Sequence, residues 1–223
     1  MTDFTSLRRA MVQGQIRTND VTDPRLTEAM LELPRERFVP AAMAELTYLD
    51  RDLPVTAPGA APTRCLLKPM TLAKLIQVAE VGPQDRILDV GCTTGYAAAV
   101  LARLGASVVA LEEVPDLARL AERNLAQLGA ASVAVVTGPL AEGWAALAPY
   151  DVILVEGRCE ILPHALTAQL APGGRLACVY GEGTAAKGTI FRRGGDEVSG
   201  RPLFEAAGTP LLPGFAVPPA FAF

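Results

Sequence analysis

From residue 86 onward, short apolar runs alternate with stretches in which apolar residues recur at helical spacing. Strand-length apolar runs lie at residues 86–90, 108–112, 133–136, 152–155 and 176–180. Between the second and third runs, Pro115 begins a stretch with leucines and alanines on one helical face, and Gly129 ends it. Alternating strands and helices predict an α/β fold, doubly wound around a mainly parallel sheet.

The first eighty residues have a different pattern, which predicts helices joined by proline-rich loop segments. Two amphipathic helices come first, the second capped by Asp23 and Pro24. A loop rich in Pro, Ala and Gly follows at residues 55–64, and another helix begins near Pro69. We therefore expect residues 1–80 to form a helical extension that packs on a core of residues 81–223, within one structural domain.

Composition and charge exclude several classes of protein. The chain has 223 residues, 50% of them hydrophobic, and a net charge of −4 without a clustered basic run, which argues against a nucleic-acid surface. No apolar run approaches the roughly 20 residues of a membrane span and no secretory signal is visible, so we expect a cytoplasmic protein without a membrane partner. The sequence leaves the oligomeric state open.

Histidine and cysteine usage narrows the chemistry further. His164 is the one histidine, at a predicted helix start, where a structural role is favoured; this argues against His-dependent triads and multi-histidine metal sites. The four cysteines are far apart, without a C-x-x-C pair, which is typical of free thiols. We predict no metal site.

The turn after the first core strand carries the most informative motif. Glycines at this point let a ligand approach the backbone N–H groups, and Glu112, at the end of the next strand, can accept hydrogen bonds from a ribose diol. A dinucleotide fingerprint anchored at Gly91 would place glycines where the chain has Thr93 and Tyr96. The pattern D-x-G-x-x-x-G instead resembles motif I of the S-adenosylmethionine-dependent methyltransferases.

This resemblance implies a Rossmann-like methyltransferase fold with S-adenosylmethionine as cofactor and S-adenosylhomocysteine as product. It implies that Asp89 supports the turn through backbone N–H contacts, Glu112 or its neighbour Glu113 holds the ribose, and Gly138 with Pro139 borders the adenine. The full set of predicted cofactor-binding residues is Asp89, Gly91, Cys92, Thr93, Gly95, Glu112, Glu113, Gly138 and Pro139.

Further motifs, collinear from about residue 5 to 180, resemble the protein-L-isoaspartate O-methyltransferases. The two most specific are P-R-E-R-F-V-P at residues 34–40 and Y-L-D-R-D-L-P at residues 48–54. The others are Met11 to Arg17, Leu67-Lys68-Pro69, Glu112 with Pro115 and Leu117, Gly143-Trp144, Pro149 to Val155 and Leu170 to Leu176. The family also adds an antiparallel C-terminal strand, expected at residues 188–193 and paired with a segment near residues 203–212.

The resemblance implies methylation of isoaspartyl residues in damaged proteins or peptides, whose esters then close to succinimides. A carboxylate with a pKa near 3.9 is ionised at neutral pH and attacks the sulfonium methyl without a general base. The enzyme then supplies mainly alignment and desolvation.

The chain departs from the family pattern at the acceptor loop. Alignment on Pro69 places Cys65, Leu66 and Leu67 in this loop, with Leu67 at the position of a serine that the family uses for the transfer. The loop at residues 136–140 also lacks the acid of the family's G-D-G segment, and Thr93 replaces the middle glycine of motif I.

The catalytic residues therefore stay open at this stage, and so do two alternatives. One is a methyltransferase with a different acceptor, in which Leu66 and Leu67 line an apolar pocket. The other is a protein that binds the cofactor without turnover.

Overall fold

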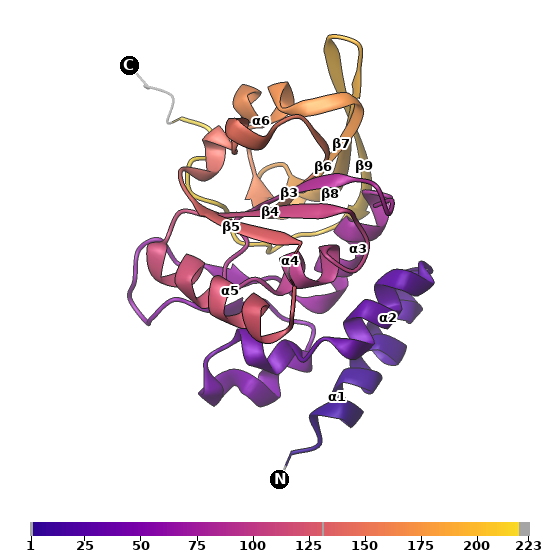
Figure 1. Ribbon diagram of the computed structural model, residues 1–223, viewed down its shortest axis with the longest axis vertical. Helices are drawn as coiled ribbons and strands as arrows, with labels where there is room; N and C mark the ends of the chain where they lie inside the picture. The colour runs from indigo at the N-terminus through magenta and orange to yellow at the C-terminus, as the bar shows by residue number, and fades with distance from the viewer. Residues whose placement is uncertain (1, 131, 219–223) are drawn as a thin grey trace.

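A seven-stranded sheet forms the centre of the computed structural model, which describes residues 2–130 and 132–218 (Figure 1). Its strand order is β5-β4-β3-β6-β7-β8-β9. The strands are β3 (Arg86–Val90), β4 (Ser107–Glu112), β5 (Val133–Thr137), β6 (Tyr150–Cys159), β7 (Leu170–Tyr180), β8 (Lys187–Gly194) and β9 (Glu197–Glu205). A separate antiparallel pair consists of β1 (Leu53–Pro54) and β2 (Cys65–Leu66).

Helices cover both faces of this sheet (Figure 1). The α-helices are α1 (Phe4–Met11), α2 (Pro24–Glu32), α3 (Pro69–Val78), α4 (Tyr96–Leu101), α5 (Pro115–Gln127) and α6 (His164–Ala168). A π-helical segment (Val12–Ile16) continues α1, and 3-10 turns lie at Arg17–Asn19, Arg35–Phe38, Ala41–Tyr48, Leu140–Glu142, Ala145–Leu147 and Gly183–Ala185. Helices α3, α4 and α5 lie on one face with α1 and α2 stacked beneath them, and α6 lies on the other (Figure 1).

The core divides into two clusters because successive strand residues point to opposite faces of the sheet. On β3, Ile87 belongs to the cluster that includes α1 to α5, whereas Leu88 and Val90 belong to the cluster under α6. Residues on both sides of position 80 share the larger cluster, among them Leu26 and Val108. The doubly wound α/β fold is thereby confirmed, while the division at residue 80 stays a prediction.

The sheet is parallel from β5 to β7 and antiparallel from β7 to β9. The antiparallel strand expected at residues 188–193 is confirmed as β8. Its expected partner near residues 203–212 is confirmed only where Gly188 pairs with Phe204; β9 begins earlier, at Glu197, and ends at Glu205. Gly195, with a φ of 63°, allows the chain to reverse within two residues, so the strands pair as a tight hairpin.

The apolar tail from Leu211 packs on the domain as far as the structure describes it, and residues 219–223 lie outside the described residues. The backbone N–H of Arg158 donates to Pro210 (2.8 Å), and that of Glu160 donates to Phe215 (2.9 Å). The Phe215 side chain is 0% exposed within the cluster under α6. The tail therefore covers the carboxyl end of β6. None of the described helices has the length and apolar content needed to cross a bilayer.

We predict that Phe215→Ala lowers the free energy of unfolding by about 3–5 kcal/mol, because it empties a filled site in the core. Val217→Ala is the matched control, since that side chain is 45% exposed and should change the free energy by less than about 0.5 kcal/mol. Urea unfolding of both variants measures the difference. Equal stability would show that the tail does not pack as described.

Candidate active site

The turn after β3 holds its shape through backbone hydrogen bonds and left-handed residues. Gly91 has a φ of 82°, and the N–H groups of Gly91 and Cys92 both donate to the carbonyl of Leu111 (2.8 and 3.1 Å). Gly95 has a φ of 93°, and a Cβ atom there would lie 3.2 Å from Leu125 on α5. The turn therefore joins β3 to α4 while it lies tightly against β4 and α5.

The Glu112 carboxylate, 0% exposed at the end of β4, binds this turn to its surroundings. Its Oε2 accepts from the backbone N–H of Thr93 (2.9 Å), and its Oε1 accepts from those of Glu113 (3.0 Å) and Val114 (3.1 Å). The Glu113 side chain is 25% exposed instead. Of the two acids predicted for the ribose, Glu112 is therefore the one buried beside the turn.

Arg64 completes this arrangement, although the sequence analysis did not identify it. Its guanidinium is 1% exposed, and Nη2 donates to the carbonyl of Gly91 (3.0 Å) and to Oε2 of Glu112 (3.2 Å). A Cβ atom on Gly91 would lie 2.6 Å from the same nitrogen, so Arg64 fills the space directly above the turn. Arg64 lies in a loop of low complexity, and no local pattern distinguishes it from a solvated arginine.

A second buried acidic group consists of Asp89, near the end of β3, and Glu156, within β6. Burial raises the pKa of Asp89 to about 7, and the Glu112 charge adds to this rise. The neighbouring Glu156 carboxyl and the Arg64 charge act in the opposite direction and lower the pKa. Burial, followed by the charge of Asp89, raises the pKa of Glu156 well above its ordinary value. At neutral pH we therefore expect the pair to hold at least one proton.

The contact predicted between Asp89 and the backbone N–H groups of the turn is wrong. No backbone N–H of the turn donates to Asp89, because Glu112 accepts from Thr93 and the carbonyl of Leu111 accepts from Gly91 and Cys92. Glu156 was also missed, although it follows the apolar run at residues 152–155 as Glu112 ends the run at 108–112. Both acids follow the last residue of an apolar run, although β6 continues past Glu156 to Cys159.

These groups suit a ligand that carries positive charge and hydroxyl groups. Several buried polar atoms have no partner in the described chain: both oxygens of Asp89 and of Glu156, Oγ1 of Thr93, and Nε and Nη1 of Arg64. Buried polar atoms are normally hydrogen-bonded, so such a group of free atoms indicates a binding site. Within the described ranges, no three His, Cys, Asp or Glu side chains are placed to hold a metal ion.

The loop predicted to receive the acceptor lies next to this group, but its leucines point elsewhere. Leu66 and Leu67 are 0% and 1% exposed and belong to the larger core cluster, and Cys65 is half-buried. Burial raises the pKa of the Cys65 thiol. The structure therefore does not favour the alternative in which Leu66 and Leu67 line an apolar pocket for a different acceptor.

The P-R-E-R-F-V-P segment positions this loop against the turn. Arg35 is 0% exposed; its Nε donates to the carbonyl of Thr47 (2.9 Å), and its Nη2 donates to the carbonyl of Leu67. The same guanidinium lies 4.7 Å from the centre of the Tyr96 ring, at the start of α4. Arg35 thus connects the N-terminal segment, the loop at Leu67 and the turn after β3.

The Y-L-D-R-D-L-P segment fixes the other end of the loop. Oδ1 of Asp52 accepts from the backbone N–H of Lys68 (2.8 Å), and Oδ1 of Asp50 accepts from that of Met70 (3.1 Å). These bonds satisfy N–H groups at the start of α3, which has no side-chain cap of its own. The motif therefore holds the junction between the acceptor loop and α3.

Gly138 and Pro139 lie at the carboxyl end of β5, beside Glu112. The N–H of Gly138 donates to the carbonyl of Glu112 (3.2 Å), and a Cβ on Gly138 would lie 3.3 Å from the Trp144 ring. Their contact with an adenine stays a prediction. His164 is exposed at the start of α6, as expected for a structural histidine, and all four cysteines are free.

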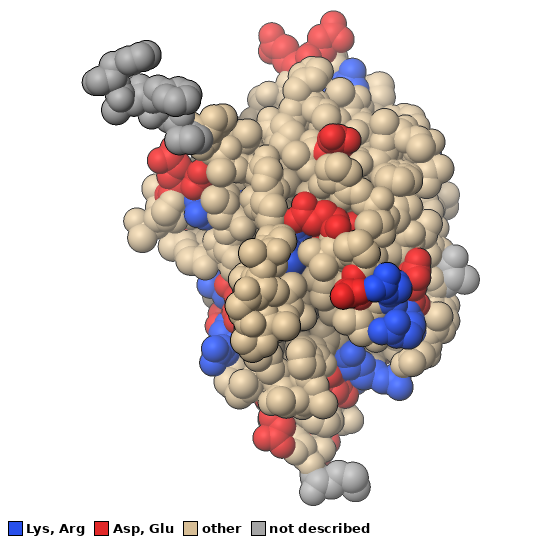
Figure 2. Space-filling model, turned by 90° about the vertical axis from the view of Figure 1, so that its left-hand side faces the viewer, with Lys and Arg blue, Asp and Glu red and all other residues tan. Residues whose placement is uncertain are grey.

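The carboxyl ends of the parallel strands point to the left of Figure 1, and Figure 2 looks onto that side. Carboxylate-bearing residues lie near its centre, and most of the visible lysines and arginines lie below them (Figure 2). This side therefore combines the buried acids of the turn with an acidic surface at its centre.

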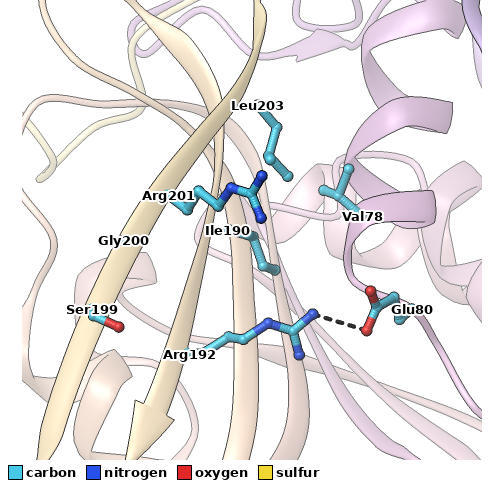
Figure 3. Close-up of a pocket in the computed structure, with 8 residues that line it drawn as sticks. All are labelled: Val78, Glu80, Ile190, Arg192, Ser199, Gly200, Arg201 and Leu203. Carbon is cyan, nitrogen blue, oxygen red and sulfur yellow. Dashed lines mark hydrogen bonds and ion pairs between the residues drawn. The ribbon is translucent and has the colours of Figure 1, made fainter.

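A hollow of about 400 Å³ lies elsewhere, between the end of α3 and the β8–β9 hairpin (Figure 3). Arg192 there pairs with Glu80 at 2.8 Å. In the sheet, Arg192 of β8 pairs with Arg175 of β7, and Arg175 pairs with Val152 near the amino end of β6. The hollow is therefore remote from the turn at Gly91, and we assign no ligand to it.

Comparisons with known proteins point to one family of relatives. A family model described as protein-L-isoaspartate(D-aspartate) O-methyltransferase matches residues 6–207. A protein-L-isoaspartate O-methyltransferase of Methylorubrum extorquens (strain PA1) is 38% identical over 213 residues, which cover 95% of this chain and 91% of that relative.

Two solved structures share the fold. One, a protein-L-isoaspartate O-methyltransferase, matches with a TM-score of 0.79 and 26% identity over 93% of this chain, which spans 66% of that longer chain. The other is a Plasmodium falciparum chain assigned to the same family and bound to S-adenosyl-L-homocysteine. It has a TM-score of 0.71 and 19% identity, and the match covers 93% of this chain and 97% of that one.

The raised pKa of Asp89 predicts that the ligand-free protein loses stability as pH rises from about 4 to about 7. Aspartate in an unfolded chain has a pKa of about 3.9. Between this pH and the raised pKa of Asp89 the folded state binds more protons than the unfolded state, so the free energy of unfolding falls as pH rises. Asp89→Asn should reduce the loss measured by urea unfolding between pH 5 and pH 8. The control is Asp196→Asn, in the exposed hairpin turn. An unchanged loss in Asp89→Asn would contradict the prediction.

Proposed function

This chain belongs to the protein-L-isoaspartate O-methyltransferase family, and on that premise we propose that it methylates isoaspartyl carboxylates of proteins, using S-adenosylmethionine. The observation that carries the proposal is the set of buried acids around the Gly91 turn, whose free oxygen atoms suit a cationic, ribose-bearing ligand. The N-terminal motifs that hold the acceptor loop against this turn support the same conclusion.

The cofactor supplies an electrophilic methyl group on a sulfonium, and this chain supplies its binding groups. We propose that Glu112 holds the ribose and that Gly138 and Pro139 border the adenine, as the sequence analysis predicts. The buried Asp89–Glu156 pair, which holds at least one proton at neutral pH, would then offer at most one negative charge to the cationic ligand. The Gly91 turn allows the ligand to approach the backbone closely.

The transfer needs no general base, because the acceptor carboxylate is ionised at neutral pH. One carboxylate oxygen forms a bond to the methyl carbon, and the electron pair of the broken S–C bond stays on sulfur. The protein contributes alignment and the exclusion of water from the reacting groups. A chain with one exposed histidine can perform this reaction.

The position of the family serine offers no hydroxyl in this chain, since Leu67 is packed in the core. The acceptor carboxylate must therefore be aligned by another group. The backbone of the loop stays in place because Arg35 and Asp52 hold it from both ends.

We predict that the purified protein transfers a labelled methyl group to an isoaspartyl peptide and not to the same peptide with a normal aspartyl residue. The difference arises because only the isoaspartyl carboxylate reaches the aligned position. Scintillation counting of the recovered peptides measures the transfer. Absence of label in the isoaspartyl peptide at high enzyme concentration would refute the proposed activity.

We predict that Glu112→Gln weakens the binding of S-adenosylhomocysteine by about tenfold or more, because a charge-assisted hydrogen bond to the ribose contributes about 1.5–3 kcal/mol. Isothermal titration calorimetry measures the affinity. Glu113→Gln is the control, since its partly exposed side chain should change the affinity by less than about threefold. Equal affinity of Glu112→Gln and the unmodified protein would remove Glu112 from the site.

A further inference from the structure

The acceptor loop brings a basic group into the acidic site. Arg64 immediately precedes β2 and lies three positions before Leu67, the residue at the position of the family serine. Among the described residues, it is the one basic side chain within hydrogen-bond distance of Glu112. The loop that lacks a hydroxyl therefore carries a buried guanidinium into the place where the reaction would occur.

A basic group at this place would offset the negative charge that an anionic acceptor meets. Glu112 and Glu113 lie beside the turn, and the Asp89–Glu156 pair adds at most one negative charge; together these acids disfavour the entry of a further carboxylate. They suit the cationic cofactor, whereas the acceptor of the proposed reaction is an anion. A guanidinium binds carboxylates through strong, directional hydrogen bonds and is charged at every relevant pH.

The guanidinium of Arg64 has donors left over for a further partner. Only Nη2 is hydrogen-bonded, to Gly91 and Glu112, while Nε and Nη1 have no hydrogen-bond partner in the described chain. Nη1 lies 3.7 Å from a carboxylate oxygen of Glu113, which is too long for a hydrogen bond. Glu112 would keep its three backbone donors after Arg64 left.

The position of Arg64 also links the two ligands. The guanidinium fills the space above Gly91 and uses the carboxylate that we assign to the ribose. A bound cofactor would therefore replace Arg64 at Glu112. The freed guanidinium stays on the acceptor loop, which Arg35 and Asp52 fix at Leu67 and Lys68.

Other polar groups of the loop are less suited to binding an acceptor carboxylate. Thr63 is exposed and its hydroxyl donates to the carbonyl of Ala60 (3.3 Å). Cys65 is half-buried, and burial keeps its thiol neutral by raising its pKa. Neither offers a positive charge to a carboxylate.

We propose that Arg64 binds the isoaspartyl carboxylate of the acceptor and that Glu112 holds it in the absence of cofactor. This assignment rests on the proposed function. It makes Arg64 the group that selects an anionic acceptor, in place of the missing loop hydroxyl.

The test compares two peptides that differ in one group: an isoaspartyl peptide, and the same peptide with that carboxylate replaced by a carboxamide. Isothermal titration calorimetry measures the binding of each to the protein saturated with S-adenosylhomocysteine. The unmodified protein should bind the carboxylate peptide at least about tenfold more tightly, as expected for a charge-assisted hydrogen bond. Arg64→Ala should reduce this preference to less than about threefold, and Arg64→Lys should keep part of it.

Arg51→Ala is the matched control, because Arg51 is an exposed arginine on the neighbouring segment and should leave the preference unchanged. Retention of S-adenosylhomocysteine binding by Arg64→Ala shows that the variant is folded. A preference that persists in Arg64→Ala, or an equal loss of affinity for both peptides, would overturn the assignment. If Arg64→Ala does not fold, the same criteria apply to Arg64→Lys, where an unchanged preference with weaker binding of both peptides would overturn it.

Methyl transfer by the unmodified protein separates the two proposals. Label on the isoaspartyl peptide together with an unchanged preference in Arg64→Ala refutes the role of Arg64 alone. No label and no preference in the unmodified protein refutes the proposed function and the assignment with it.

Discussion

The hydrogen bonds of the Glu112 carboxylate are the constraint on which the site depends. One buried side chain accepts from the turn after β3, from the two residues that lead into α5, and from the acceptor loop through Arg64. Three segments distant in sequence are thereby held at the carboxyl end of one strand. Because a buried carboxylate without partners would cost several kcal/mol, these segments must stay close while the protein is folded.

Burial of this many charges is costly, so their presence indicates a functional role more than a stabilising one. Arg64, Asp89, Glu112 and Glu156 are all at most 2% exposed. Arg64 on the acceptor loop is paired with Glu112, and the Asp89–Glu156 pair lies beside them with at least one proton at neutral pH. A site of this kind can receive a cation and an anion together, as a methyl transfer from a sulfonium to a carboxylate requires.

The N-terminal extension contributes to the site by holding the acceptor loop rather than by presenting reactive groups. Arg35 reaches the loop at Leu67 and the ring of Tyr96, and the carbonyl of Phe38 accepts from the hydroxyl of Thr94 in the cofactor turn (2.6 Å). The loop and the turn after β3 therefore share supports from the P-R-E-R-F-V-P segment at residues 34–40.

Strand periodicity and the punctuation of helices by Pro and Gly determined the fold, because both are local. They gave α2 from Asp23, α5 from Pro115 and the parallel strands, and the acid at the end of β4 gave Glu112. The partner of β8 was expected too far along the chain, because the turn at Gly195 forms a hairpin with a shorter connection than expected. Arg64 required the tertiary structure, since its role depends on a contact with Glu112 across 48 positions. The sequence shows which charged residues a chain carries, and only the folded chain shows which of them are buried next to each other.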